Sequence, residues 1–332
     1  MEKRNMKNRW VKSAGVLYAA ALCFAVFSGC GSEKTEVPRK ELISGYTEAQ
    51  MLVIASSEKN RYEDILTEGI WDAAGGTGEG GLMENLEQEI RAFMGELKVV
   101  SYIAKDQGIT LTDTEEKAMA GAAEEYYNSL SQSDKEAMGL TQEEILELYR
   151  EYCLAQKFAG GLARQDDLEV SDSEAKVIHV LQASTENRDA AVRLREMASG
   201  ENANFRNCAA ELGIPVRELA PGRGQAFDED SRKLEEAEFA LAAGQVSDII
   251  EIGTAFYVIY CENDYDEEAT RERKERISAA RVENAFRRIY EAYGERVEVT
   301  EDAGAYDRLN LQTLALADKS DFFRVYSKYK LQ

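Results

Sequence analysis

The sequence predicts a mainly α-helical part together with an α+β domain that carries a small, antiparallel-rich sheet. The first observation is that apolar residues recur at steps of three and four through most of residues 41–165, which is typical of amphipathic helices. The second is an order of β-rich and helical runs between residues 176 and 261 that ends in a hairpin signal. The third is that the chain has only 3 prolines, fewer than a loop-rich all-β protein needs.

The amino terminus is typical of a secretory signal. Residues 1–12 carry five Lys or Arg against one Glu, and an apolar run follows from Ala14 to Phe27. A membrane-spanning helix needs about 20 residues, so we interpret residues 1–29 as a signal peptide instead. The residues Val26-Phe27-Ser28-Gly29-Cys30 resemble the bacterial lipobox, which implies lipid on Cys30 and an anchor outside the cytoplasm. An ordinary signal beside a chance cysteine is the alternative. Residues 30–44 are predicted to be a polar tether.

Helical patterns dominate the part that follows. An apolar face predicts a long helix from Leu82 that ends at Gly108. Capping boxes at 112–115 and 141–144 each open a further helix, with a polar break at 131–139 between them. The inward face of the last helix is predicted to consist of Ile145, Leu148, Tyr149, Tyr152 and Phe158. The glycine-rich stretch 73–81 lacks the spacing of a phosphate-binding loop, and we expect a connector there.

The α+β domain has its own order of elements. A β-rich run at 176–183 precedes helical patterns at 186–198 and 203–212, a loop at 216–230, and a helical pattern at 231–243. Two β-rich runs, 246–252 and 255–261, flank Gly253-Thr254, which predicts a hairpin. A charged helix is predicted from 266 to 294, and the pattern of 310–332 leaves open whether that segment packs.

The composition narrows the classes of function. The 332 residues include 40 Lys+Arg and 62 Asp+Glu, and the resulting net charge of −22 argues against binding to the phosphates of nucleic acids. The single histidine, His179, excludes sites that need two imidazoles. No His, Cys or carboxylate group has metal-ligand spacing, and we expect neither a metal nor an organic cofactor.

Three motifs in the α+β domain resemble parvulin-type peptidyl-prolyl isomerases. They are Ile178-His179-Val180-Leu181, then Arg223-Gly224-Gln225, and the helix Leu234–Leu241 followed by Gly244-Gln245-Val246-Ser247. With helices on both sides, residues 45–300 resemble the SurA/PrsA class of extracytoplasmic foldases, whose PrsA-like members are lipoproteins. The resemblance implies that helices from both chain ends build one chaperone lobe around the isomerase domain.

The resemblance also implies domain boundaries. A helical lobe is expected at 45–170, a parvulin-like domain at 171–264, a helix returning to the lobe at 265–300, and a tail at 301–332. The sequence departs from the family at two positions, because Tyr257 stands where a second inward His is usual and Leu234 where Phe is usual. A loop that normally follows the second helix also looks shortened.

The resemblance implies a candidate site. Isomerisation must lower a barrier of about 20 kcal/mol, which a site can do by favouring the twisted amide. Phe227, Leu234 and Phe239 are expected to form an apolar slot for proline, beside Arg223 and Gln225. His179 and Tyr257 are expected to face each other on neighbouring central strands as a hydrogen-bonded catalytic pair. His179, Tyr257 and Phe239 could each be core residues instead.

Two functions remain open at this stage. The first is a lipid-anchored peptidyl-prolyl isomerase that acts on newly secreted polypeptides. The second is a non-catalytic chaperone that holds unfolded polypeptides and whose parvulin domain is an inactive scaffold. A solute-binding lipoprotein fits the amino terminus, but the alternating strand and helix pattern of such proteins is missing from the sequence.

Overall fold

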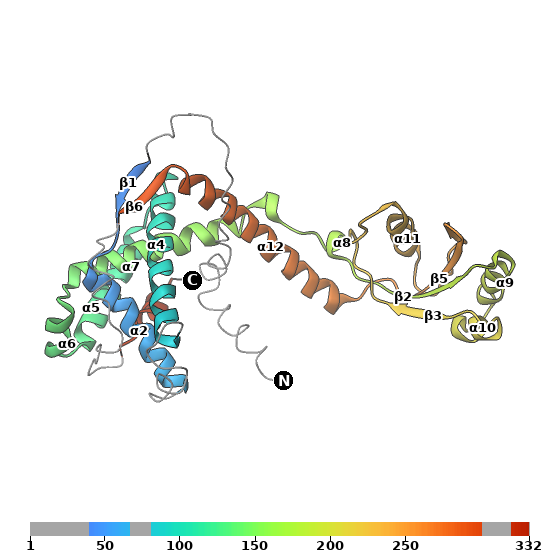
Figure 1. Cartoon of the computed structure of the whole chain (residues 1–332), viewed down its shortest axis with the longest axis horizontal. Coiled ribbons are helices and arrows are strands. Elements are labelled where there is room, and N and C mark those ends of the chain that lie inside the picture. Colours follow the sequence, from blue (N-terminus) through green and yellow to red (C-terminus); the bar gives the residue numbers. More distant parts are fainter. Residues whose placement is uncertain (1–39, 67–80, 301–319, 332) are drawn as a thin grey trace. The chain divides into compact units, whose positions relative to one another are not determined.

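The computed structural model describes residues 40–66, 81–300 and 320–331 (Figure 1). Contacts divide these residues into unit 1, which comprises those up to 163 and those from 283 onward, and unit 2, residues 164–282. The predicted signal peptide, Cys30 and most of the glycine-rich connector lie outside the described residues. The fold class is the predicted one, a mainly helical unit and an α+β unit with a small antiparallel sheet.

Unit 1 consists of helices with one short pair of strands. Its elements are β1 (Glu41–Ser44), α2 (Glu48–Leu66), α4 (Leu82–Asp106), α5 (Asp113–Ser129), α6 (Gln132–Met138), α7 (Gln142–Leu162), the end of α12 (Glu267–Gly294), β6 (Val297–Thr300) and α14 (Phe322–Tyr329). Both predicted capping boxes are confirmed, at Thr112 and Thr141. Gly108 follows α4 with a φ of +75°, as its predicted role at the helix end requires.

Two segments of unit 1 differ from the sequence prediction. The expected tether, residues 30–44, ends in strand β1, which pairs in parallel with β6 from Glu41 opposite Val297 to Ser44 opposite Thr300. The expected polar break contains helix α6, because the Ser131 side chain accepts a hydrogen bond from the backbone N–H of Asp134 and caps it. The strand depends on a distant partner, whereas the helix is capped by the residue directly before it.

The core of unit 1 contains a cluster of aromatic rings that α14 completes. The inward face predicted for α7 is buried in full. Phe322 of α14 is fully buried, and its ring stacks on Tyr149 at 4.1 Å between centroids. The Tyr149 hydroxyl donates to the carbonyl of Phe322, and the N–H of Phe322 donates to the Ser57 hydroxyl. The end of the expected tail therefore packs, and it joins residues far apart in the sequence.

Unit 2 is built on one four-stranded antiparallel sheet with the order β3-β2-β5-β4. The strands are β2 (His179–Thr185), β3 (Val216–Leu219), β4 (Ile250–Ile252) and β5 (Ala255–Asn263), and the helical elements are η1 (Asp166–Leu168), α8 (Asp172–Ala175), α9 (Arg188–Ala198), α10 (Phe205–Glu211) and α11 (Glu229–Ala240). The hairpin is confirmed, with Gly253 at a φ of +58° between β4 and β5. Strand β3 lies inside the segment predicted to be a loop, because it pairs with β2 from Val216 to Leu219.

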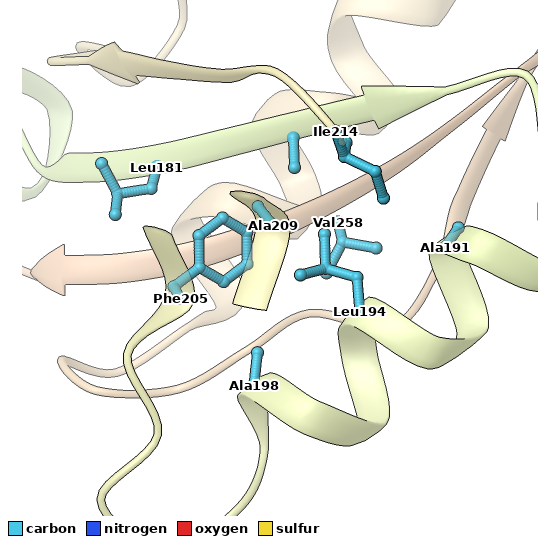
Figure 2. Close-up of a cluster of buried hydrophobic side chains, with 9 residues drawn as sticks. Leu181, Ala191, Leu194, Ala198, Phe205, Ala209, Ile214 and Val258 are labelled. Carbon is cyan, nitrogen blue, oxygen red and sulfur yellow. The ribbon is translucent and has the colours of Figure 1, made fainter. Parts of the chain in front are cut away.

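Each face of this sheet carries an apolar cluster. The first cluster joins Leu181 and Val258 of the sheet to α9 and α10, through side chains such as Leu194 and Phe205 (Figure 2). The second cluster consists of buried Ile178, Val180 and Ile259, on which side chains of α11 pack. Helix α11 therefore covers one face of the sheet while α9 and α10 cover the other.

Candidate functional site

The predicted catalytic pair does not form. The strands that carry it, β2 and β5, are neighbours, but their register places His179 opposite Asn263 and Tyr257 opposite Ser184. The residues on both sides of His179, Ile178 and Val180, belong to the second cluster. Since side chains alternate along a strand, His179 lies on the first-cluster face and Tyr257, two residues from Ile259, on the second. The prediction that these two side chains face each other is wrong, because the sequence does not specify the register between two strands.

His179 is bound to an acidic residue at the start of α12. Its ring Nε2 lies 2.7 Å from Oδ2 of Asp266. The other oxygen of Asp266 accepts a hydrogen bond from the N–H of Ala269, and its backbone N–H donates to the carbonyl of Val177. The Ala269 hydrogen bond, followed by the one to His179, lowers the pKa of Asp266. These contacts connect the beginning of β2 to the first turn of α12, and His179 is one of the side chains that make this connection.

The predicted substrate-binding motif forms an ordered loop, which we call the Arg-Gly-Gln loop, residues 220–226. One carboxylate of α11, Glu235, accepts hydrogen bonds from three successive backbone N–H groups: those of Gly224 at 2.5 Å, Gln225 at 2.9 Å and Ala226 at 2.8 Å. The side chain of Arg273 donates to the carbonyl of Arg223. An anionic clamp on one side and a cationic one on the other therefore fix the loop.

The expected proline slot is only partly assembled. Leu234 and Phe239 come together on the second cluster, where both are partly buried against the sheet. The guanidinium of Arg223 lies over the Phe239 ring at 4.8 Å from its centroid, which is a cation–π contact. Phe227 is 89% exposed and does not join them. Gln225 is exposed as well, and its side-chain oxygen accepts a hydrogen bond from the N–H of Gly222.

A small open cavity of about 280 Å³ lies between the Arg-Gly-Gln loop and α11. It is lined by Leu219, Ala220, Pro221, Gly222, Gln225, Ala226, Ser231, Leu234, Glu235 and Glu238. Two of the predicted site residues, Gln225 and Leu234, therefore line the same cavity. The lining holds two carboxyl groups and no cationic side chain.

Glu238 is the residue in this cavity that sequence reasoning missed. It is only 5% exposed, although it stands in a charged helix. Burial, and then the negative charge of Glu235, raise the pKa of Glu238 to about 7. The available signal was its spacing, because Glu238 follows Leu234 by one helical turn and therefore lies on the same inward face.

Within residues 40–66, 81–300 and 320–331, no three His, Cys, Asp or Glu side chains converge as metal ligands would. In the same residues, no helix combines the length and the apolar character that crossing a bilayer requires.

Solved structures of PrsA proteins are among those that resemble this chain. No family model matches the sequence, and no curated protein matches it. The structure of foldase protein PrsA from Streptococcus pneumoniae is 16% identical, with a TM-score of 0.22, and the match covers 68% of this chain and 90% of that one. The peptidylprolyl isomerase PrsA from Bacillus cereus is 13% identical, with a TM-score of 0.29, over 80% and 93%. PrsA from Bacillus subtilis is 17% identical, with a TM-score of 0.20, over 70% and 93%.

Proposed function

We propose that this protein is an extracytoplasmic protein-folding factor that binds unfolded or newly secreted polypeptides through a parvulin-like domain. The observation that carries the proposal is that residues 176–263 fold around one sheet. Beside this sheet, Glu235 of α11 holds the Arg-Gly-Gln loop through hydrogen bonds. This arrangement gives the motif a fixed shape beside a cavity. The motif resembles the Arg-Gly-Gln sequence that precedes the substrate-pocket residues of that isomerase family.

The geometry favours the non-catalytic form of this function. His179 is engaged by Asp266, and Tyr257 lies on the other sheet face, so the two groups proposed for catalysis do not meet. In a holding role, an exposed aromatic side chain is useful because it contacts apolar segments of an unfolded chain. Phe227, at 89% exposure, is such a side chain. A peptidyl-prolyl isomerase remains the alternative proposal, with Phe239 and Leu234 as its apolar surface.

Two assays on the full-length protein separate these functions. The first is a protease-coupled proline isomerisation assay, with Phe239→Ala and His179→Ala beside the parent. The second measures light scattering as an unfolded test protein aggregates in the presence of the parent or of Phe227→Ala. Tyr265→Ala is the matched control, since Tyr265 is a large exposed side chain of the same unit, at 42%.

The holding function predicts no acceleration of isomerisation, suppressed aggregation by the parent, weaker suppression by Phe227→Ala, and no change for Tyr265→Ala. Turnover that both Phe239→Ala and His179→Ala abolish, in folded protein, would establish the isomerase instead. A parent protein with neither activity would refute both forms of the proposal.

We further propose that lipid on Cys30 holds the protein at the outer side of the cell membrane. The support is the signal-like segment 1–29 and the small residues before Cys30. Two acyl chains are enough for stable anchoring, whereas one is marginal. Mass spectrometry of the membrane fraction should find lipid on the peptide that begins at Cys30, and Cys30→Ser should release the protein from that fraction. Membrane retention of the unmodified variant would contradict the proposal.

A further inference from the structure

The cavity beside α11 contains a buried acid without a partner. Glu238 is 5% exposed, and within the described residues the interactions that shift the pKa of its carboxyl group include neither a hydrogen bond nor a cation. Buried carboxyl groups are costly unless they are paired or hydrogen-bonded. Burial, and then the negative charge of Glu235, raise the pKa of Glu238. The side chain lines the cavity, so a ligand that enters the cavity can supply the missing donor.

The neighbouring polar groups are already engaged. Glu235 accepts three backbone hydrogen bonds from the Arg-Gly-Gln loop. The Ser231 hydroxyl takes part in the capping box with Asp228 at the start of α11. The side-chain oxygen of Gln225 accepts from the N–H of Gly222. Glu238 therefore provides the acceptor that is open to a new donor.

The other walls of the cavity indicate the shape of the ligand. Leu219, Pro221 and Leu234 add apolar side chains to the lining that contains the acid. A volume of about 280 Å³ is close to the lower limit of small-molecule sites, so it suits one side chain better than an organic cofactor. An aliphatic stem with a cationic end matches such a site, because the stem contacts the apolar wall while the charged end reaches the carboxylate. The net charge of −22 also favours a cationic ligand, since it attracts basic segments.

We propose that this cavity binds a lysine or arginine side chain of an extended client polypeptide, with the Glu238 carboxylate as the partner of its charged group. The inference rests on the proposed function, because it assumes that the ligand is a polypeptide. It adds a preference that the expected proline slot does not provide: a basic residue in the bound segment.

The test uses fluorescein-labelled peptides that differ at one central position, which is lysine, arginine, norleucine or glutamine. Their dissociation constants are measured by fluorescence anisotropy with the full-length protein, with Glu238→Gln and with Glu236→Gln. Glu236 is the matched control, since it is exposed on the same helix and the substitution removes the same charge. Melting curves verify that each variant is folded.

The lysine and arginine peptides are expected to bind the parent at least about tenfold more tightly than the norleucine peptide, the size expected of a hydrogen-bonded charge pair. Glu238→Gln should reduce the ratio to within about twofold, and Glu236→Gln should preserve it. Equal binding of the lysine and norleucine peptides by the parent overturns the inference, whether or not Glu238→Gln folds. A preference for the lysine and arginine peptides that persists in Glu238→Gln also overturns the inference. If aggregation is suppressed while the peptides bind without preference, the basic-residue inference fails and the folding-factor proposal stands; absence of binding and of suppression refutes both.

Discussion

Replacement of Glu96 by glutamine should remove a large part of the pH dependence of stability in unit 1. Glu96 lies on α4, is 7% exposed, and has one side-chain oxygen without a hydrogen-bond partner. Burial raises its pKa from 4.5 to about 8. Between these two values the folded chain keeps the proton and the unfolded chain releases it. Stability is therefore highest below the unfolded pKa and decreases as the pH rises toward the folded pKa.

The size of this loss of stability follows from the pKa shift of Glu96. Each pKa unit corresponds to about 1.4 kcal/mol, so the full rise from 4.5 to about 8 corresponds to a loss on the order of 5 kcal/mol between pH 4.5 and 8. The amide of Glu96→Gln does not ionise. The free energy of unfolding of the variant should therefore exceed that of the parent by several kcal/mol more at pH 9 than at pH 5.

Urea denaturation of the full-length protein at pH 5, 7 and 9, followed by far-ultraviolet circular dichroism, measures this difference, and hydrogen exchange of α4 amides assigns it to unit 1. Glu124→Gln removes the same charge at an exposed position of α5 and should show no such trend. The difference in the free energy of unfolding between parent and Glu96→Gln would refute the reasoning if it stayed constant within about 0.5 kcal/mol from pH 5 to pH 9. A change of that size is usual for surface substitutions.

Three further substitutions test the packing. Phe322→Ala removes a fully buried ring stacked on Tyr149 and should lower the free energy of unfolding by about 3–5 kcal/mol in urea titrations; a loss under about 1 kcal/mol would mean that α14 is not part of the core. Gly222→Ala places a methyl group 2.5 Å from Nε of Arg273, so the Arg-Gly-Gln loop should lose hydrogen-exchange protection, and unchanged protection would count against the clamp. Gly95→Ala has open space around its new methyl group within α4 and should raise stability by about 0.5–1 kcal/mol, whereas a lower melting temperature would show an unrecognised contact.

Local features of this fold could be predicted from the sequence, because the residues that cause them are adjacent. The capping boxes at Thr112 and Thr141 need only a hydroxyl and a carboxylate three positions apart, and both are present. The turn at Gly253 needs a positive φ, which glycine adopts at little cost. The three motifs of the α+β domain likewise lie within continuous segments.

Features that depend on distant partners could not be predicted in the same way. Strand β3 is four residues long and exists because it pairs with β2, and β1 exists because it pairs with β6. The register of β2 and β5 separates His179 from Tyr257, and both strands have apolar residues on each face, so their patterns permit more than one alignment. The site consequently contains Glu238, which the motif comparison did not single out, and lacks the expected pair.

The discontinuity of unit 1 has a consequence for biogenesis. Helix α14 supplies Phe322 to an aromatic cluster in which its partners Tyr126, Tyr149 and Tyr152 belong to helices from the first half of the chain, while unit 2 is a continuous segment. During synthesis, unit 2 can thus fold before α14 has been made, while the earlier helices of unit 1 still lack the Phe322 ring. Chains that end before α14 would expose the apolar surface on which Phe322 packs, and proteases could recognise such chains as incomplete.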